Sequence, residues 1–156
     1  QKGNQPKDLT SDSVYRVVSR FAPINVSEAK VYSFWPVIAS LPKSKDKYPA
    51  IKTDPVSIQS IWKSGDYLNM VLQIMVKDQE HDLSFIDNGI VRNEDGTQTL
   101  KLTLFHDRKN DVEGFNQKFY LSIPLWHYQE TLHRGDSIVF QLNTYQEGIS
   151  SRTFIY

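Results

Sequence analysis

Two histidine–carboxylate pairs are the residues of this chain whose types are best suited to chemistry. His81-Asp82 and His106-Asp107 each stand where a strand pattern ends. Imidazole and carboxylate groups placed together can hold a metal ion or act as a general acid and base. The sequence around them, however, has neither the HxH nor the HExxH spacing of metal sites. We therefore interpret both pairs as solvated strand ends, and we predict no metal site.

Other motifs that carry catalysis are absent from the sequence. There is no GxSxG turn for a hydrolytic serine, no GxGxxG or GxxxxGK loop for phosphates, and no cysteine. A pair of distant carboxylates for glycoside cleavage stays open, because no spacing selects one pair over another. We predict that the protein is not an enzyme, has no catalytic residues and uses no cofactor.

Three tryptophans, Trp35, Trp62 and Trp126, are the candidate ligand-binding residues. Exposed indole faces allow a β-sandwich to stack on sugar rings, which favours a glycan-binding hypothesis. The alternative is that the indoles are core residues whose N–H groups find partners near a sheet edge, and we favour this interpretation. A third motif, Arg134-Gly135-Asp136, matches the tripeptide that integrins bind, but glycine and aspartate are typical of a turn there.

Charge and hydropathy narrow the class of partner. The chain has 18 basic and 18 acidic residues. Nucleic acids and anionic membranes attract clustered positive charge, so we predict no nucleic-acid partner and no direct electrostatic binding to a membrane. No apolar run approaches the roughly 18 residues that span a bilayer. Residues 1–12 are polar, which predicts a flexible tether.

Alternating apolar and polar residues indicate the strands that must position these side chains. In Gln98–Asn110, leucines alternate with threonine and lysine, which predicts a strand with one buried and one solvated face. We expect Tyr67–Lys77 to be central and covered on both sides at one end. Asn88-Gly89 indicates a turn, and Asn93 to Gly96 a tight hairpin. We predict an all-β protein with an antiparallel β-sandwich over residues 57–156.

Two segments depart from this rhythm. Pro124–Leu132 starts with proline and places Leu125, Tyr128 and Leu132 on one side, which predicts a short helix that crosses between the sheets. The N-terminal part contains the strand patterns Ser13–Arg20 and Ala29–Leu41, the second interrupted by Pro36, and then a proline-rich loop. We predict a separate small β subdomain over residues 13–56.

Four motifs, in this order, resemble the NigD-like family, which are lipoproteins of Bacteroidetes. They are Trp62-x-x-Gly65-x-Tyr67-Leu68-Asn69, the strand Leu83 to Phe85, the strand Leu102 to Asp107 with Asn110-Asp111 after it, and Phe119-x-Leu121-x-Ile123. The family's third motif runs leucine, x, leucine, x, histidine, asparagine or aspartate, three residues, aspartate. The resemblance covers Ser60 to Tyr156 well and the N-terminal part poorly.

The resemblance implies an N-terminal OB-like barrel before the β-sandwich, so the small subdomain is expected to be OB-like. It also implies a lipidated cysteine upstream of Gln1, a location in the cell envelope at the outer membrane, and no known catalytic activity. Membrane contact would be through that lipid alone. We therefore expect an envelope-tethered binding module, with bacteriocin immunity as one role. The alternative is a glycan-binding module of a carbohydrate-uptake system, so the expected partner is an envelope protein or a glycan.

Overall fold

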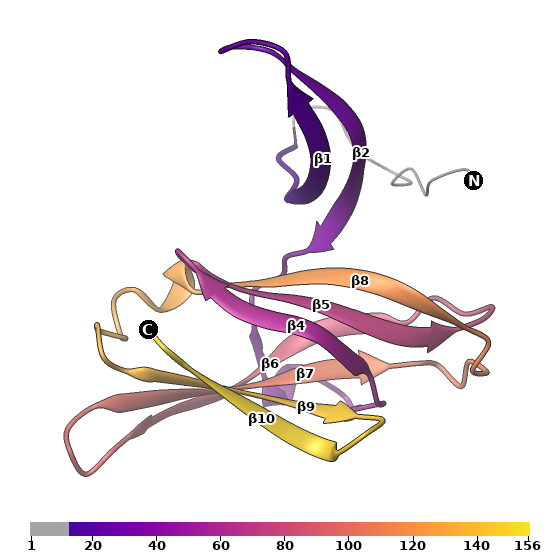
Figure 1. The fold of residues 1–156 in the computed structure, drawn as a ribbon. Coiled ribbons are helices and arrows are strands. Elements are labelled where there is room, and N and C mark those ends of the chain that lie inside the picture. Colours follow the sequence, from indigo (N-terminus) through magenta and orange to yellow (C-terminus); the bar gives the residue numbers. More distant parts are fainter. Residues whose placement is uncertain (1–12) are drawn as a thin grey trace.

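The chain folds into two β-sheets that stack face to face (Figure 1). The computed structural model describes residues 13–156, so the predicted tether at residues 1–12 lies outside the described residues. One sheet, in the order β1-β2-β8-β5-β4, contains β1 (Val17–Pro23), β2 (Ala29–Ile38), β8 (Phe115–Pro124), β5 (Tyr67–Val76) and β4 (Ser57–Ser64). The other, in the order β10-β9-β7-β6-β3, contains β10 (Gly148–Ile155), β9 (Ser137–Thr144), β7 (Gln98–Asp107), β6 (Asp82–Arg92) and β3 (Lys43–Ser44). The predicted all-β sandwich is confirmed.

Strand pairing in the two sheets is mixed. Hairpin partners such as β4 and β5, β6 and β7, and β9 and β10 are antiparallel, as predicted. Three contacts are parallel: β7 with β9, β3 with β6, and β2 with β8. Parallel neighbours need a long connection, and here the chain supplies it by visiting the opposite sheet, as β8 does between β7 and β9.

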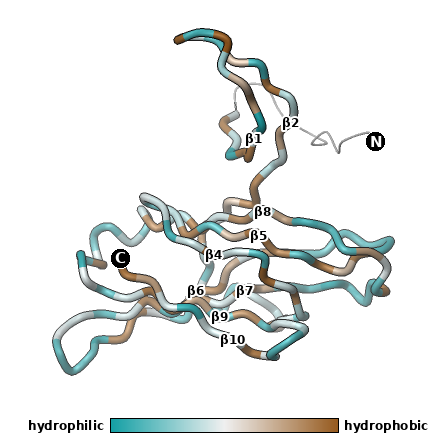
Figure 2. The backbone as a smooth tube through the Cα atoms, in the orientation of Figure 1, coloured by the Kyte–Doolittle hydropathy of each residue, from teal (hydrophilic) through white to brown (hydrophobic). Residues whose placement is uncertain are grey.

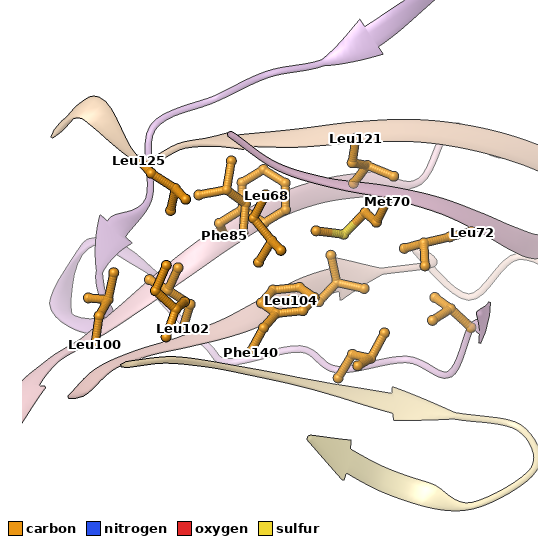
Figure 3. Packing of buried hydrophobic residues seen from close by; sticks show 14 of the residues in the cluster. Leu68, Met70, Leu72, Phe85, Leu100, Leu102, Leu104, Leu121, Leu125 and Phe140 are labelled. Carbon is orange, nitrogen blue, oxygen red and sulfur yellow. The ribbon is translucent and has the colours of Figure 1, made fainter. Parts of the chain in front are cut away.

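The core fills the space between the two sheets (Figure 3). Leu100, Leu102 and Leu104 of β7 point into it, which confirms the strand with one buried face. The stretch from Leu68 to Leu72 in β5 is buried without interruption, so this strand is covered on both faces there, as predicted. Burying one leucine- or phenylalanine-sized side chain stabilises the fold by about 1.5–3 kcal/mol, so this cluster dominates the stability of the sandwich.

The crossover from the first sheet to the second is a single 3-10 turn, η2 (Trp126–Tyr128), and not the predicted helix over Pro124–Leu132. Leu125, Tyr128 and Leu132 are buried together, so the predicted apolar side is correct. The backbone bonds there run mainly from one residue to the third before it, for example from Tyr128 N–H to Leu125 O. The Tyr128 hydroxyl donates to Asp87 of the second sheet at 2.8 Å, which ties the turn to that sheet.

The predicted OB-like subdomain over residues 13–56 is not confirmed. An OB barrel has five strands, whereas residues 13–36 form one antiparallel hairpin of β1 and β2. Residues 37–56 belong to the sandwich instead: Val37 and Ile38 pair with β8, β3 and the 3-10 turn η1 (Lys45–Lys47) lie beside β6, and Val56 is fully buried. Pro36 marks the change, because β2 pairs with β1 up to this residue and with β8 after it.

The β1–β2 hairpin stands away from the stacked sheets (Figure 1). It joins them through the two β2 residues that pair with β8. Among residues 13–156, no helix has the length and hydropathy needed to cross a membrane.

Candidate functional site

The three tryptophans are all half-exposed, so the interpretation that they are core residues is wrong. Relative exposure is 39% for Trp35 and 44% for both Trp62 and Trp126. Trp62 lies on β4 and Trp35 on β2, and the Trp35 ring is 6.0 Å from that of Tyr120 on β8. Trp126 lies apart from them on η2, where its ring contacts His127. Two of the three candidates therefore flank the outer face of the first sheet.

A hollow of about 290 Å³ lies on that outer face, at the base of the hairpin. Arg16, Val17 and Val37 line it from the hairpin side, and Trp62, Asn69 and Tyr120 are among the residues that line it from the sheet. The strand register explains why side chains of three strands lie together, since Trp62 of β4 pairs with Asn69 of β5, and Asn69 pairs with Ser122 of β8. These three side chains therefore stand on the same face of the sheet. Aromatic and polar groups converge there, which is typical of ligand sites.

A polar cluster forms one wall of this hollow. Arg16 donates from Nε to Ser122 Oγ at 3.0 Å and from Nη2 to Asn69 Oδ1 at 3.0 Å. The Ser122 hydroxyl in turn donates to Asn69 Oδ1 at 2.7 Å. The guanidinium also lies over the Tyr67 ring, with Cζ 3.8 Å from the ring centroid. These contacts bind the chain just before β1 to the face of the sheet.

The hairpin carries many exposed apolar side chains, and Figure 2 shows hydrophobic residues along both of its strands. Cross-strand neighbours are apolar, as in Val18 opposite Trp35 and Phe21 opposite Val31. We call the following exposed side chains the hairpin surface: Val17, Val18, Phe21, Ile24, Val31, Tyr32, Phe34 and Trp35. Exposed apolar patches on soluble proteins mark interaction sites, so this surface is the second candidate for function.

The two histidines that the sequence pointed to lie together in the structure. His81 Nδ1 is 2.9 Å from His106 Nε2, and His81 Nε2 is 3.2 Å from Asp111 Oδ2. His106 Nδ1 is 2.9 Å from the backbone oxygen of Asp54. The side chains of His81 and Asp111 are 1% and 3% exposed. The interpretation of these histidines as solvated strand ends is therefore wrong.

Hydrogen atoms along this chain of groups can be counted. A backbone carbonyl and a carboxylate only accept, so His106 Nδ1 donates to Asp54 O, and His81 Nε2 donates to Asp111. One further hydrogen must lie between the two facing ring nitrogens. Burial lowers the pKa of His106 below its ordinary value.

Asp111 is held as a carboxylate. Burial by itself would raise its pKa, but the backbone N–H groups of Asp78 and Lys77 and the His81 ring outweigh burial, so the pKa lies well below its usual range. Lys77 N–H donates to Oδ2 at 2.7 Å, and the N–H groups of Asp78 and Val112 each donate to Oδ1 at 3.0 Å. This carboxylate ties the end of β5 to the loop before β8.

The histidine pair is placed to hold structure together. All four ring nitrogens have partners within the protein. His81 also lines a neighbouring hollow of about 730 Å³, together with Tyr48, Lys52 and Glu80. Within residues 13–156, no three histidine, aspartate or glutamate side chains are arranged to hold a metal ion. The pair joins β7, the Asp54 loop and the β5 end.

The Arg134-Gly135-Asp136 motif is a turn, as its sequence indicated. Gly135 has a φ of 100°, in the region that favours glycine. Asp136 is buried, and it accepts hydrogen bonds from the N–H groups of Gln98 and His133. A buried aspartate with these partners is not presented to a receptor.

The sequence analysis did not identify Arg16 and Asn69 of the hollow beneath the hairpin, or Asp111 beside the histidine pair. Arg16 and Asn69 meet through contacts between residues 53 positions apart, for which the sequence gives no local signal. Asp111 did have a signal, because the family motif places an aspartate five residues after the histidine, as in His106 and Asp111. That fixed spacing indicated a pair that acts as a unit.

Comparisons with known proteins agree with the fold. The profile of the NigD-like C-terminal beta sandwich domain matches residues 37–156. A NigD-like immunity protein from Bacteroides caccae is 27% identical, with a TM-score of 0.72, over 91% of this chain and 76% of that one. No curated protein matches the chain.

Two further solved structures share the fold at lower identity. A putative toxin-related protein from Parabacteroides distasonis is 20% identical with a TM-score of 0.68, over 91% of this chain and 72% of that one. A protein of unknown function from Bacteroides vulgatus is 19% identical with a TM-score of 0.69, over 91% and 71%. The match to the family profile begins at Val37, where the sandwich begins, and it covers well over half of the chain. The resemblance seen in the sequence is thus confirmed, and the chain belongs to the NigD-like family through its C-terminal β-sandwich.

Proposed function

We propose that this protein is a non-enzymatic binding module of the cell envelope that takes a protein partner through its β1–β2 hairpin, in a role of the immunity type. The observation that carries the proposal is the hairpin surface. None of the residues in β1 or in the part of β2 that pairs with it is buried, although about half are apolar. A two-stranded ribbon of this kind is marginal in water by itself, and a partner laid against it would cover the apolar side chains.

Names of related proteins support the immunity role. The Bacteroides caccae relative, at 27% identity, is described as an immunity protein. Immunity proteins act by binding, and tight complexes of toxins with their immunity proteins are among the strongest known. The hairpin also offers open strand edges, because β1 pairs with β2 alone and β2 meets β8 at two residues. Open edges favour a partner that adds a strand of its own.

Attachment to the envelope belongs to the same proposal. The family resemblance implies a lipidated cysteine ahead of Gln1, and the polar composition of residues 1–12 suits a spacer between lipid and domain. Metabolic labelling of the full-length precursor with an alkyne fatty acid, followed by membrane fractionation, tests this. Label that is absent, or that survives mutation of the precursor's cysteine, contradicts the anchor.

The binding role is tested by protection and by direct binding. Where a toxin gene lies beside the gene for this protein, its product is the candidate partner to test. Cells that express the protein are expected to survive that toxin, and the purified toxin is expected to bind on a biosensor. Phe21→Ser and Tyr32→Ser should each weaken binding, because they remove apolar area from the hairpin surface. Ile149→Ser is the matched control, since Ile149 is 72% exposed on β10, outside the hairpin.

Two results would contradict the proposal. One is an equal effect of the hairpin and Ile149 substitutions on toxin binding, or no protection at all. The other is a hydrolytic turnover that persists through purification and is abolished by one carboxylate substitution.

A second candidate function, glycan binding in a carbohydrate-uptake system, is favoured by a different observation. Trp62 is half-exposed and lines the hollow beneath the hairpin, beside Asn69 and Tyr120. An indole face with polar neighbours is an arrangement that can stack on a sugar ring. A screen of the protein on a glycan array tests it, and loss of every positive signal in Trp62→Ala is the expected result.

A further inference from the structure

We infer that the hollow beneath the hairpin binds an acidic sugar, with Arg16 and Asn69 holding its carboxylate and the Trp62 indole stacking on its ring. The inference rests on the second candidate function, glycan binding, and names the class of sugar. It follows from three observations on the hollow: an unpaired cation, an unfilled amide donor and an exposed aromatic face.

The cation is Arg16. It is the sole charged residue among those described that line the hollow, and no carboxylate in residues 13–156 lies within ion-pair distance of it. Its contacts are the neutral oxygens of Ser122 and Asn69 and the Tyr67 ring. These contacts fix the plane of the guanidinium, and within residues 13–156 the two hydrogens on Nη1 have no partner. A rigid guanidinium with free hydrogens is suited to a carboxylate.

The unfilled donor is the side-chain amide of Asn69. Arg16 has only donors, so the atom of Asn69 that faces it must be the oxygen, and Nδ2 must point the other way. Asn69 is only 7% exposed, yet Nδ2 has no hydrogen-bond partner among the described residues. The Nδ2 atom is itself accessible to solvent, and it opens into the hollow that Asn69 lines. A nearly buried amide with free hydrogens favours a ligand that brings acceptor oxygens.

The aromatic face decides between a simple anion and a sugar. Trp62 is 44% exposed, and it stands next to Asn69 across the β4–β5 pair. A pyranose ring has an apolar face that an indole can cover, and its hydroxyl groups can meet Ser64 at the edge of the hollow. The volume of about 290 Å³ is near the lower end of the roughly 300–1,000 Å³ of ligand pockets, which suits one sugar residue.

The test uses the chain of residues 1–156 and four probes: D-glucuronate, its methyl ester, D-glucose and benzoate. Titrations followed by saturation-transfer NMR are expected to show glucuronate binding about tenfold more tightly than the ester or glucose, because a charged hydrogen bond is lost with the carboxylate. Trp62→Ala should weaken glucuronate binding about fivefold. Trp126→Ala is the matched control, since its indole is equally exposed but lies on η2.

Arg16→Met should remove the preference for glucuronate over its ester. This variant also releases the hairpin from the sheet, so the decisive measurement is the comparison of the two ligands on the unmodified chain. Equal binding of glucuronate, ester and glucose would overturn the acidic-sugar inference and leave glycan binding standing. Benzoate that binds as tightly as glucuronate would show that the hollow recognises a carboxylate and not a sugar, which would overturn the inference. If neither glucuronate nor glucose binds, but a glycan from the array binds at another surface, the acidic-sugar inference fails while glycan binding as a function stands.

Discussion

The sandwich and the hairpin are built from the same kinds of residue and differ in what covers them. In the sandwich, Phe85 and Phe140 meet edge to face between two sheets and are fully buried. In the hairpin, Phe21 and Phe34 stand in solvent on a ribbon of two strands. Strand propensity is therefore satisfied in both regions, but burial, which supplies most of the folding free energy, is present in one. The apolar side chains of the sandwich stabilise the fold, whereas those of the hairpin are left uncovered.

The difference also appears in how the regions use polar groups. In the sandwich, Asp111 and Asp136 are buried with several hydrogen bonds and close loops onto strand ends. In the hairpin, the ordered polar contacts are in the tip, where Asn25 accepts from Ser27, and at the base, where Arg16 reaches the sheet. Between tip and base the hairpin keeps its apolar side chains available.

The largest effect is expected from a hole in the sandwich core. Phe140→Ala removes a fully buried ring and should lower the free energy of unfolding by about 3–5 kcal/mol. For a chain of this size that shifts the melting temperature by roughly 10 °C. Phe115→Ala is the control, because that ring is 57% exposed on β8. Comparable losses in the two variants would show that the sandwich core does not dominate stability.

A smaller loss is expected from the buried histidine pair. His81→Leu leaves the buried Asp111 carboxylate without the ring that contacts it at 3.2 Å, and removing one partner of a buried charged group costs about 3 kcal/mol. Chemical denaturation measures the effect. His133→Leu is the control, since its side chain is 76% exposed. A His81→Leu protein as stable as the control would show that the contact between His81 and Asp111 does not contribute to stability.

Local periodicity was enough to predict the sandwich. Alternation in β7 identified the leucines that face the core, because a strand exposes its side chains to two faces in turn. It could not place the histidines. If the register set by the turn at Asp95-Gly96 continued along β6 and β7, His106 would lie opposite Ser84. The chain has a bulge at Asn88-Gly89, where the sequence predicted a turn. The bulge shifts the register by one residue, so His106 pairs with Leu83.

Long-range contacts account for what the sequence did not predict. The exposure of Trp62 depends on whether anything covers the outer face of its sheet, and strand alternation does not contain that information. The η2 turn is bound to the opposite sheet by the hydrogen bond from Tyr128 to Asp87, a contact across 41 residues that local periodicity does not contain. The hairpin was predicted as part of an OB-like barrel because the family resemblance implied one, and the two strand patterns at Ser13–Arg20 and Ala29–Leu41 do not show which strands become neighbours.

A pH effect of intermediate size is expected in the sandwich. Burial lowers the pKa of His106, so between that lowered pKa and the ordinary value of 6.5 the unfolded chain binds more protons than the folded one. The contribution of His106 to stability is therefore complete above about pH 6.5 and falls as the pH falls through this window. Protonation of Asp111, whose pKa is also lowered, adds a further loss under strong acid. Melting temperatures from pH 7.5 to 5 measure the slope, and His106→Gln should flatten it whereas His127→Gln should not.

The smallest effect on stability is expected in the hairpin, where it is the most informative. Phe21→Ser exchanges a ring that is 57% exposed, and its free energy of unfolding should change by less than about 0.5 kcal/mol. The same substitution should abolish or weaken partner binding, so the two readouts separate in this region, whereas Phe140→Ala would lower both together. Denaturant melts followed by circular dichroism give the first readout, and the biosensor titration gives the second. A loss of stability above 1 kcal/mol would mean that the hairpin folds against something within its own chain, and the apolar surface would then be core rather than interface.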